Sequence, residues 1–202
     1  MASRSRSVSR LRAKLVHSRL LVTILLINSF TAMSQTNEPS KKTPADVMRE
    51  VRLKVLTTPS SQMGRKPSAE YPHVDSMLMD WPIEETTVTV MASSVGDGSI
   101  YTTGTFGVMG GIGHESVRDA GKDFVKLGEK YYSEAIPTKE YPYPQRGRVR
   151  FYFVCYDEVR VIDVDAESLA NGKNKYSDLY IQAHRVISEL RQIVQEQKSD
   201  AR

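Results

Sequence analysis

Cysteine is scarce in this sequence, whose 202 residues include a single one, Cys155. One thiol cannot form an intrachain disulfide, so the fold has to rely on a hydrophobic core in place of covalent cross-links. With 40% hydrophobic and 26% charged residues, the composition is typical of a soluble globular protein that can build such a core. We expect Cys155 to be buried and unreactive, because it falls on the apolar face of a predicted strand.

Acidic residues are absent from the first 34 positions, which carry six Lys and Arg residues. These basic residues precede an apolar run over 20–27, and small and polar residues follow it. This order is typical of a secretory signal peptide, and cleavage after Ser34 would leave Gln35 as the first residue. The sequence therefore predicts a signal peptide over 1–34, a flexible lead-in over 35–43, and export to the periplasm or the extracellular space.

Two other roles for this leader stay open. Its start, rich in Arg and Ser, also fits an organellar transit peptide, although such peptides form amphipathic helices and the run over 20–27 is apolar all round. An uncleaved membrane anchor needs about 20 apolar residues, more than this run contains. A leader kept as an anchor would be the expected membrane contact of the chain. Because no cysteine follows the run, a lipid-modified cysteine is excluded.

Positive charge is not in excess beyond the leader. Of the 28 Lys and Arg residues, 22 lie after position 34, where all 24 Asp and Glu residues are found. The high isoelectric point of the whole chain thus comes from the leader. Affinity for nucleic acid depends on clustered cations, so the sequence predicts no nucleic-acid partner.

Apolar periodicity predicts elements in the order helix, hairpin, helix, hairpin, helix. The expected helices cover 44–56 (with an apolar stripe on Val47, Val51 and Val55), 114–135 and a terminal segment from Ser177, and the expected strands cover 86–94, 99–106, 149–156 and 159–165. Hairpins separated by helices favour the α+β class: an antiparallel sheet built from two hairpins, with three helices packed against it. The order resembles that of small profilin-like or roadblock-like domains in topology alone, which implies no function.

A single α+β domain over 44–198 is therefore expected, and it includes a long irregular segment. Residues 57–85 contain four prolines, and proline ends helices and is disfavoured in central strands. We expect the one tryptophan of the chain, Trp81, to anchor this segment on the core.

A glycine-rich turn before the second long helix is the candidate ligand-binding site. Its residues are Gly110, Gly111, Gly113 and His114. Glycines between a strand and a helix can let backbone N–H groups bind an anion. However, a phosphate loop needs Gly-Lys-Ser/Thr, and no lysine lies between Ile100 and Arg118. A dinucleotide-binding turn would need a third glycine where Ser116 stands. Tight turns and close backbone packing are the alternative explanation.

Metal-ligand and catalytic patterns are missing as well. Asp163, Asp165 and Glu167 alternate, but a calcium loop begun at Asp163 would need glycine and glutamate where Ser168 and Asn174 stand. The histidines beyond the leader lack metal-ligand spacing, and the sequence has no Gly-x-Ser-x-Gly elbow. We predict no metal, no cofactor and no catalytic residue.

The alternating acids fit a hairpin better than a metal site. A turn at 157–158 would place Asp165 opposite Arg150 and Asp163 opposite Tyr152, with both acids facing outward. The side chains predicted to face the core are Phe151, Phe153 and Cys155.

The segment Tyr141-Pro142-Tyr143-Pro144 is the pattern that most favours recognition. Proline keeps the backbone extended, and tyrosine is enriched at interfaces, so Tyr141 and Tyr143 are candidate partner-binding residues. The alternative is a rigid connector whose tyrosines lie back on the domain. The sequence thus predicts an exported, non-catalytic domain that binds another envelope protein or a peptide. Its alternative is an exported enzyme or small-ligand binder that uses the glycine-rich turn before His114.

Overall fold

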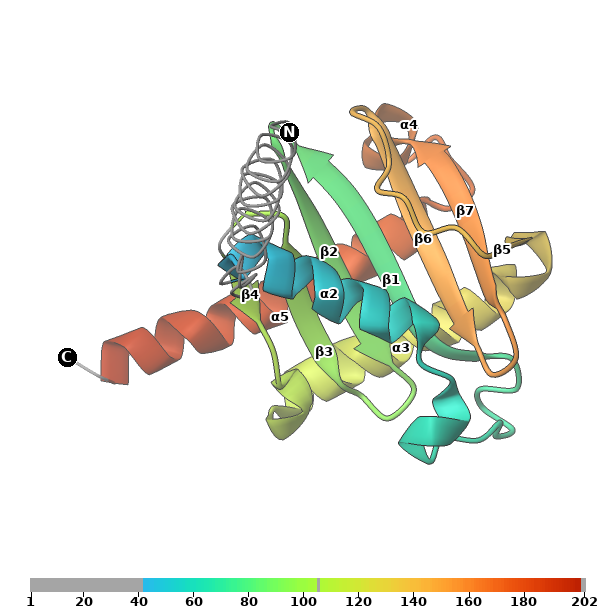
Figure 1. Ribbon diagram of the computed structural model, residues 1–202, viewed down its shortest axis with the longest axis horizontal. Coiled ribbons are helices and arrows are strands. Elements are labelled where there is room, and N and C mark those ends of the chain that lie inside the picture. Colours follow the sequence, from blue (N-terminus) through green and yellow to red (C-terminus); the bar gives the residue numbers. More distant parts are fainter. Residues whose placement is uncertain (1–41, 105, 201–202) are drawn as a thin grey trace, which may run out of the picture. The chain divides into compact units, whose positions relative to one another are not determined.

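A seven-stranded antiparallel sheet forms the centre of the computed structural model, which describes residues 42–104 and 106–200. The predicted leader lies outside the described residues, and so does most of the lead-in. Across the sheet the order is β4-β3-β2-β1-β6-β7-β5 (Figure 1). The strands are β1 (Val74–Ile83), β2 (Thr86–Ser93), β3 (Gly98–Thr102), β4 (Gly107–Val108), β5 (Ile136–Thr138), β6 (Arg148–Cys155) and β7 (Val159–Asp165).

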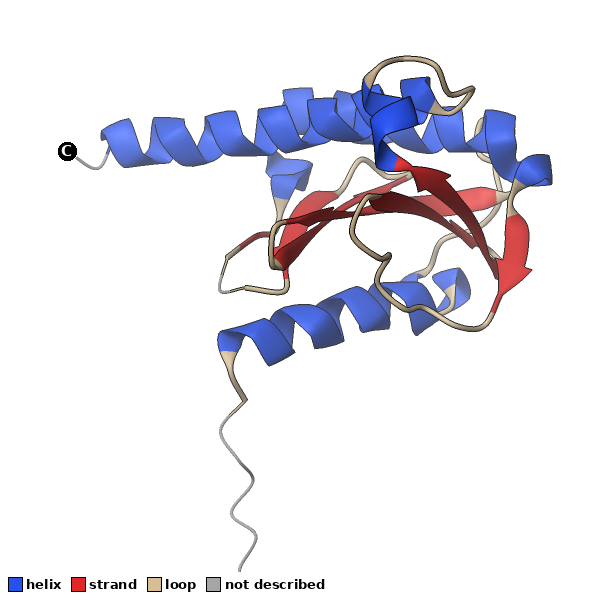
Figure 2. Ribbon diagram, turned by 90° about the horizontal axis from the view of Figure 1, so that it is seen from above, coloured by secondary structure: helices blue, strands red, loops and turns tan. Residues whose placement is uncertain are grey.

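Helices cover both faces of this sheet. The helices are α2 (Pro44–Thr57), α3 (Glu115–Tyr131), α4 (Ala166–Ala170) and α5 (Ser177–Asp200), with short 3₁₀ turns at Ser60–Met63, Gly111–Gly113 and Tyr132–Glu134. The long helices α3 and α5 lie side by side on one face, and α2 lies alone on the other (Figure 2). The predicted α+β class is confirmed, but the sheet is larger than two hairpins.

Strand β1 corrects the prediction of an irregular segment over 57–85. It lies at the centre of the sheet, paired with β2 on one side and β6 on the other. Its first seven residues are all buried, because helices cover both of its faces. A strand buried on both faces does not alternate between apolar and polar residues, so the period-two pattern was missing. Pro82 stands near the end of the strand, where the loss of its amide hydrogen affects the ladder least.

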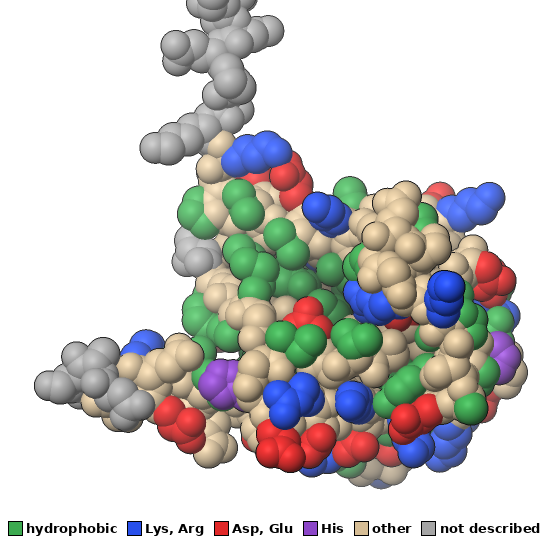
Figure 3. Space-filling view, turned by 90° about the horizontal axis from the view of Figure 1, so that it is seen from below, with side chains coloured by type: hydrophobic (Ala, Val, Ile, Leu, Met, Phe, Trp, Pro, Cys, Tyr) green, Lys and Arg blue, Asp and Glu red, His purple; other side chains and the backbone are tan. Residues whose placement is uncertain are grey.

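Alternate residues of the central strands build two hydrophobic cores. Toward α3 and α5, the buried side chains include Met77, Met79, Phe151 and Phe153. Toward α2, they include Leu78, Met91, Tyr101, Tyr152 and Val154. The α2 side is the less completely covered one, and Figure 3 shows apolar side chains around a hollow beside this helix. Partly buried Met48, Val51 and Val55 of α2 pack against this second core.

Close approach of α3 to the sheet depends on one glycine. A Cβ at Gly128 would lie 2.6 Å from the sulfur of the fully buried Met77. Glycine weakens a helix by about 1 kcal/mol relative to alanine. Gly128 allows α3 to pack directly on β1, and this close contact explains why a glycine stands in the apolar stripe of the helix.

The first helix begins as predicted and turns part of the predicted apolar stripe toward the sheet. Thr43 and Asp46 form a reciprocal capping box, with Pro44 at the first helical position. The predicted stripe is confirmed in part, since Val51 and Val55 pack against the core. Val47, in contrast, is 39% exposed, and the buried side chains of the helix are Arg52 and Leu56. The helix is rotated so that Arg52 faces the sheet, where it meets a buried carboxylate.

The β6–β7 hairpin has the predicted faces but a different register. Arg150 pairs with Asp163 in place of Asp165, because the turn lies at 156–157, one residue earlier than predicted. The partner changes by two residues, so every side chain keeps its face. Asp163 and Asp165 are exposed as expected. The inward positions of Phe151, Phe153 and Cys155 are likewise confirmed.

Candidate functional site

A pocket of about 460 Å³ opens where the C-terminal end of α2, strand β5 and the β6–β7 turn meet. We call it the α2 pocket. Its lining consists of residues 56–59, 137–139, Tyr141 and 154–159. Among these, Leu56, Val154 and Val159 also belong to the α2-side core, so the base of the pocket is apolar.

Local sequence signals place the three walls of the α2 pocket. Helix α2 ends at Thr57, and the amide of Thr58 caps the carbonyl of Lys54 at 2.9 Å. Pro59 has no amide hydrogen, so it cannot make the next helical bond, which would be to the carbonyl of Val55. At the opposite wall, the amide of Cys155 donates to the carbonyl of Glu158 at 2.8 Å and closes the β6–β7 turn.

The wall formed by this turn carries negative charge. Asp157 and Glu158 both line the pocket, and Glu158 lies 3.5 Å from Arg160. Burial raises the pKa of the Cys155 thiol to about 12, and the neighbouring charges of Glu158 and Asp157 add to the effect. Cys155 is buried, as predicted, and its raised pKa makes the thiol a poor nucleophile at neutral pH.

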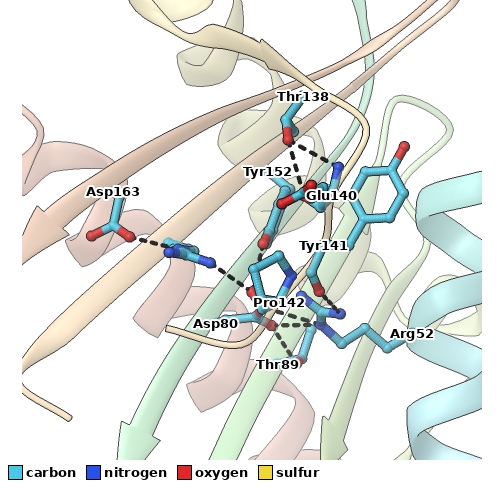
Figure 4. A network of polar contacts seen from close by, with 10 residues as sticks. Arg52, Asp80, Thr89, Thr138, Glu140, Tyr141, Pro142, Tyr152 and Asp163 are labelled. Carbon is cyan, nitrogen blue, oxygen red and sulfur yellow. Dashed lines mark hydrogen bonds and ion pairs between the residues drawn. The ribbon is translucent and has the colours of Figure 1, made fainter. Parts of the chain in front are cut away.

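A buried ion pair holds α2 on the sheet. Arg52 donates through Nε to both carboxylate oxygens of Asp80 in β1, at 3.0 and 3.1 Å (Figure 4). Thr89 in β2 donates its hydroxyl to the same carboxylate at 2.5 Å. Burial raises the pKa of Asp80, while Arg52 and Thr89 act in the opposite direction. Burial also opposes the charge of Arg52, but the hydrogen bond and charge of Asp80 prevail and raise its pKa. Both side chains are enclosed, since Arg52 is 3% exposed and Asp80 is 0% exposed.

The Tyr-Pro segment, residues 141–144, lies along this ion pair. The carbonyl of Tyr141 accepts from Arg52 at 3.0 Å, and the ring of Tyr143 lies 4.2 Å from the guanidinium carbon. The carbonyl of Pro142 accepts from the hydroxyl of Tyr152 at 2.7 Å (Figure 4). Both candidate tyrosines are half-buried and lie back on the domain. Tyr141 also lines the α2 pocket. Partner binding by Tyr141 stays a prediction, and the pocket is the place where it would occur.

The four residues of the glycine-rich turn lie between β4 and α3, and none of them lines the α2 pocket. A Cβ at Gly111 would lie 2.6 Å from Val117 Cγ1 and 2.9 Å from the carbonyl oxygen of Gly98, so close packing requires glycine there. Gly110 has φ +87°, which favours glycine for conformational reasons. Gly113 and His114 are exposed, and the His114 side chain makes no capping bond to α3. Ligand binding at this turn remains a prediction.

The alternating acids make structural contacts. Asp163 pairs with Arg148 at 2.6 Å and with Arg150 at 2.5 Å. Asp165 accepts from the amide of Ser168 at 2.8 Å and caps α4. Within 42–104 and 106–200, no group of three or more acidic, histidine or cysteine side chains is arranged to hold a metal ion.

Arg52 and Asp80 are the important residues that sequence reasoning missed. A usable signal was present in each case. Arg52 stands between Val51 and Leu53 in the first helix, and Asp80 lies between Met79 and Trp81 in an apolar run. A charged residue inside an apolar pattern is rarely buried alone, so two such residues of opposite charge favour a pair.

Comparison with protein-family models, curated proteins and solved structures finds no match to this chain. None of the helices described over 42–104 and 106–200 has the length and apolar character needed to cross a bilayer.

Proposed function

We propose that this domain binds an exposed segment of another protein, and that the α2 pocket is the binding site. The observation that carries the proposal is a preformed pocket with an apolar base beside an exposed apolar edge of the sheet. Ile136 in β5 pairs with Val161, whose side chain lies on the α2 side of the sheet. Directly paired residues point to the same side, so Ile136 extends the apolar surface beyond the pocket.

This apolar edge favours a protein partner over a small molecule. Ile136 is 69% exposed, the largest exposed fraction among the large hydrophobic side chains described. A small ligand in the pocket would leave Ile136 in water, whereas a protein segment that crosses β5 would cover it. Pro137 offers no amide hydrogen, so side-chain packing accounts for binding better than addition of a strand does.

The framework of the pocket is already ordered, which lowers the entropic cost of binding. Arg52 and Asp80 fix α2 over the sheet, and the Tyr-Pro segment fixes Tyr141 at the pocket wall. At the glycine-rich turn, the alternative location, close packing accounts for Gly111 and backbone conformation accounts for Gly110. The α2 pocket is therefore the better candidate.

Photo-crosslinking at matched positions tests the binding site. Lys139 is an exposed residue that lines the pocket, and Lys122 is an exposed residue of α3 on the other face of the sheet. With benzoylphenylalanine at position 139, we expect adducts to a defined segment of a partner, and at position 122 no such adduct. That segment, made as a peptide, should bind the purified chain, and Ile136→Ser should weaken binding. Equal adducts at both positions, or none at position 139, would contradict the proposal.

We further propose that binding takes place outside the cytoplasm, in the periplasm or the extracellular space. The support is the order of basic residues, apolar run and small residues over 1–34. N-terminal sequencing of the native protein checks it, with a start near Gln35 expected. An intact Met1 or Ala2 in a soluble cytoplasmic fraction would exclude export.

A further inference from the structure

The α2 pocket is lined by more negative than positive groups, and this excess indicates what kind of side chain enters it. The pocket meets the C-terminal end of α2, where the helix dipole presents its negative end. Pro59 leaves the carbonyl of Val55 without the helical hydrogen bond that an amide at that position would supply. The helix end is therefore an acceptor-rich surface, suited to a hydrogen-bond donor or a cation.

The opposite wall adds a carboxylate without an assigned partner in the described ion pairs. Glu158 forms an ion pair with Arg160 at 3.5 Å, whereas no ion pair of the described residues includes Asp157. Lys139 is the one cation among the lining residues, and it is exposed. Burial is the main cause of the raised pKa of Cys155, and the charges of Glu158 and Asp157 add to it while that of Arg160 opposes it.

Beneath these charges the pocket is apolar. Leu56, Val154 and Val159 are buried residues at its base, with Tyr141 at one side. A side chain that suits both features has a long aliphatic stem and a cationic end. Lysine and arginine have this form, because their methylene groups pack on apolar surface while the charged end stays near acceptors and water.

We infer that the α2 pocket takes a lysine or arginine side chain of the partner, next to an apolar residue that covers Ile136. This inference rests on the proposed function. The stem of the cationic side chain lies on Leu56 and Val159, and its charged end lies between the last carbonyls of α2 and the carboxylate of Asp157. Acidic segments are disfavoured at the same site, because the C-terminal end of α2 and the β6–β7 turn both repel them.

Three peptides that differ at one position test the inference. The probes are acetylated Ser-Ile-X-Ile-Ser amides in which X is lysine, norleucine or glutamate, titrated into the full chain and followed by NMR shifts of the pocket amides of Thr57, Thr58 and Asp157. Norleucine keeps the aliphatic stem and removes the charge. We expect the lysine peptide to bind at least about tenfold more tightly than the norleucine peptide, and the glutamate peptide more weakly than both.

Variants of one carboxylate locate the effect. Asp157→Asn should reduce the preference for lysine over norleucine severalfold, and Asp157→Glu, which keeps the charge, should retain it. Asp119→Asn is the matched control, because Asp119 is an exposed acid of α3 on the other face of the sheet. A control that lowers the preference as much as Asp157→Asn would show that only net charge matters.

Different results would overturn the inferred cation and the proposed binding site. If the peptides shift the pocket amides but norleucine or glutamate binds as tightly as lysine, the inferred cation is wrong and the pocket remains a binding site. If no peptide shifts these amides and no crosslink forms at position 139, the proposed function is wrong and the inference falls with it.

Discussion

Replacing one member of the buried pair Arg52–Asp80 should destabilise the fold more than replacing both. In Arg52→Met, the carboxylate of Asp80 keeps only Thr89 as a side-chain donor. In Asp80→Asn, the guanidinium stays buried without a counter-charge. Opposite charges about 4 Å apart attract by about 4 kcal/mol at an effective dielectric constant of about 20. Removing one partner of a buried pair costs about 3–5 kcal/mol of unfolding free energy, which is the loss expected for each variant.

The double variant Arg52→Met/Asp80→Asn removes the cost of burying the charges together with their attraction. Arg52 is 3% exposed and Asp80 is 0% exposed, so both desolvation costs are large. We therefore expect the double variant to lose less than about 3 kcal/mol, which gives a coupling energy of at least about 3 kcal/mol. The contacts of Arg52 with Tyr141 and Tyr143 are lost in both variants that lack the arginine, so they cancel from the coupling.

Urea unfolding followed by the fluorescence of Trp81 measures these free energies. Trp81 is the single tryptophan and lies against Tyr180 and His184 of α5, so its environment changes when the core opens. The control is the exposed pair of Lys126 and Glu70, 3.4 Å apart, whose coupling should stay below about 1 kcal/mol. Losses at Arg52 and Asp80 that add within about 0.5 kcal/mol would refute the reasoning.

Three further predictions use the same unfolding assay or a simple chemical one. Phe153→Ala should cost about 3–5 kcal/mol of unfolding free energy because it leaves a cavity in the core. Asp163→Asn should cost about 1 kcal/mol or less because its ion pairs are partly exposed, and the opposite order would contradict the assigned faces of the hairpin. Gly128→Ala should lower stability, although alanine is the better helix former, because the new Cβ would lie 2.6 Å from the sulfur of Met77; a gain in stability would show that Met77 can move aside. Alkylation of Cys155 at pH 8 should be on the order of a thousandfold slower in the folded chain than in urea, since its pKa is raised to about 12; similar rates would mean that the thiol is exposed.

Short-range signals predicted the elements that depend on neighbours in the chain. The predicted start of the first helix at residue 44 agrees with the observed start of α2 at Pro44. The apolar stripes of α3 and α5 gave both helices, because an amphipathic helix repeats its contacts every three or four residues. Period-two alternation gave β2, β6 and β7, and it assigned Phe151 and Phe153 to the core.

Other features depended on parts of the chain that are distant in sequence. Strand β1 was missed because its burial comes from helices on both faces, which removes the alternation by which a strand is recognised. The turn of the β6–β7 hairpin was misplaced by one residue, since an Asp-Glu pair specifies a turn weakly and Arg148 and Arg150 both reach Asp163 in the observed register.

In the candidate site, too, some features follow from the local sequence and others only from the tertiary structure. The sequence alone selected Tyr141 and Tyr143 from their spacing with proline, and it identified Cys155 as a buried thiol. The α2 pocket comes from three segments about 80 and 20 residues apart in the chain, and no local pattern records that they meet.

What the sequence determined by itself is therefore its local structure: where helices begin and which strands alternate. The tertiary structure decided the central strand, the hairpin register, the ion pair of Arg52 with Asp80, and the α2 pocket. The physical reason is that capping, helical periodicity and strand alternation act between residues a few positions apart. Pairing of a buried charge and closure of a pocket depend on which surfaces the folded chain brings together.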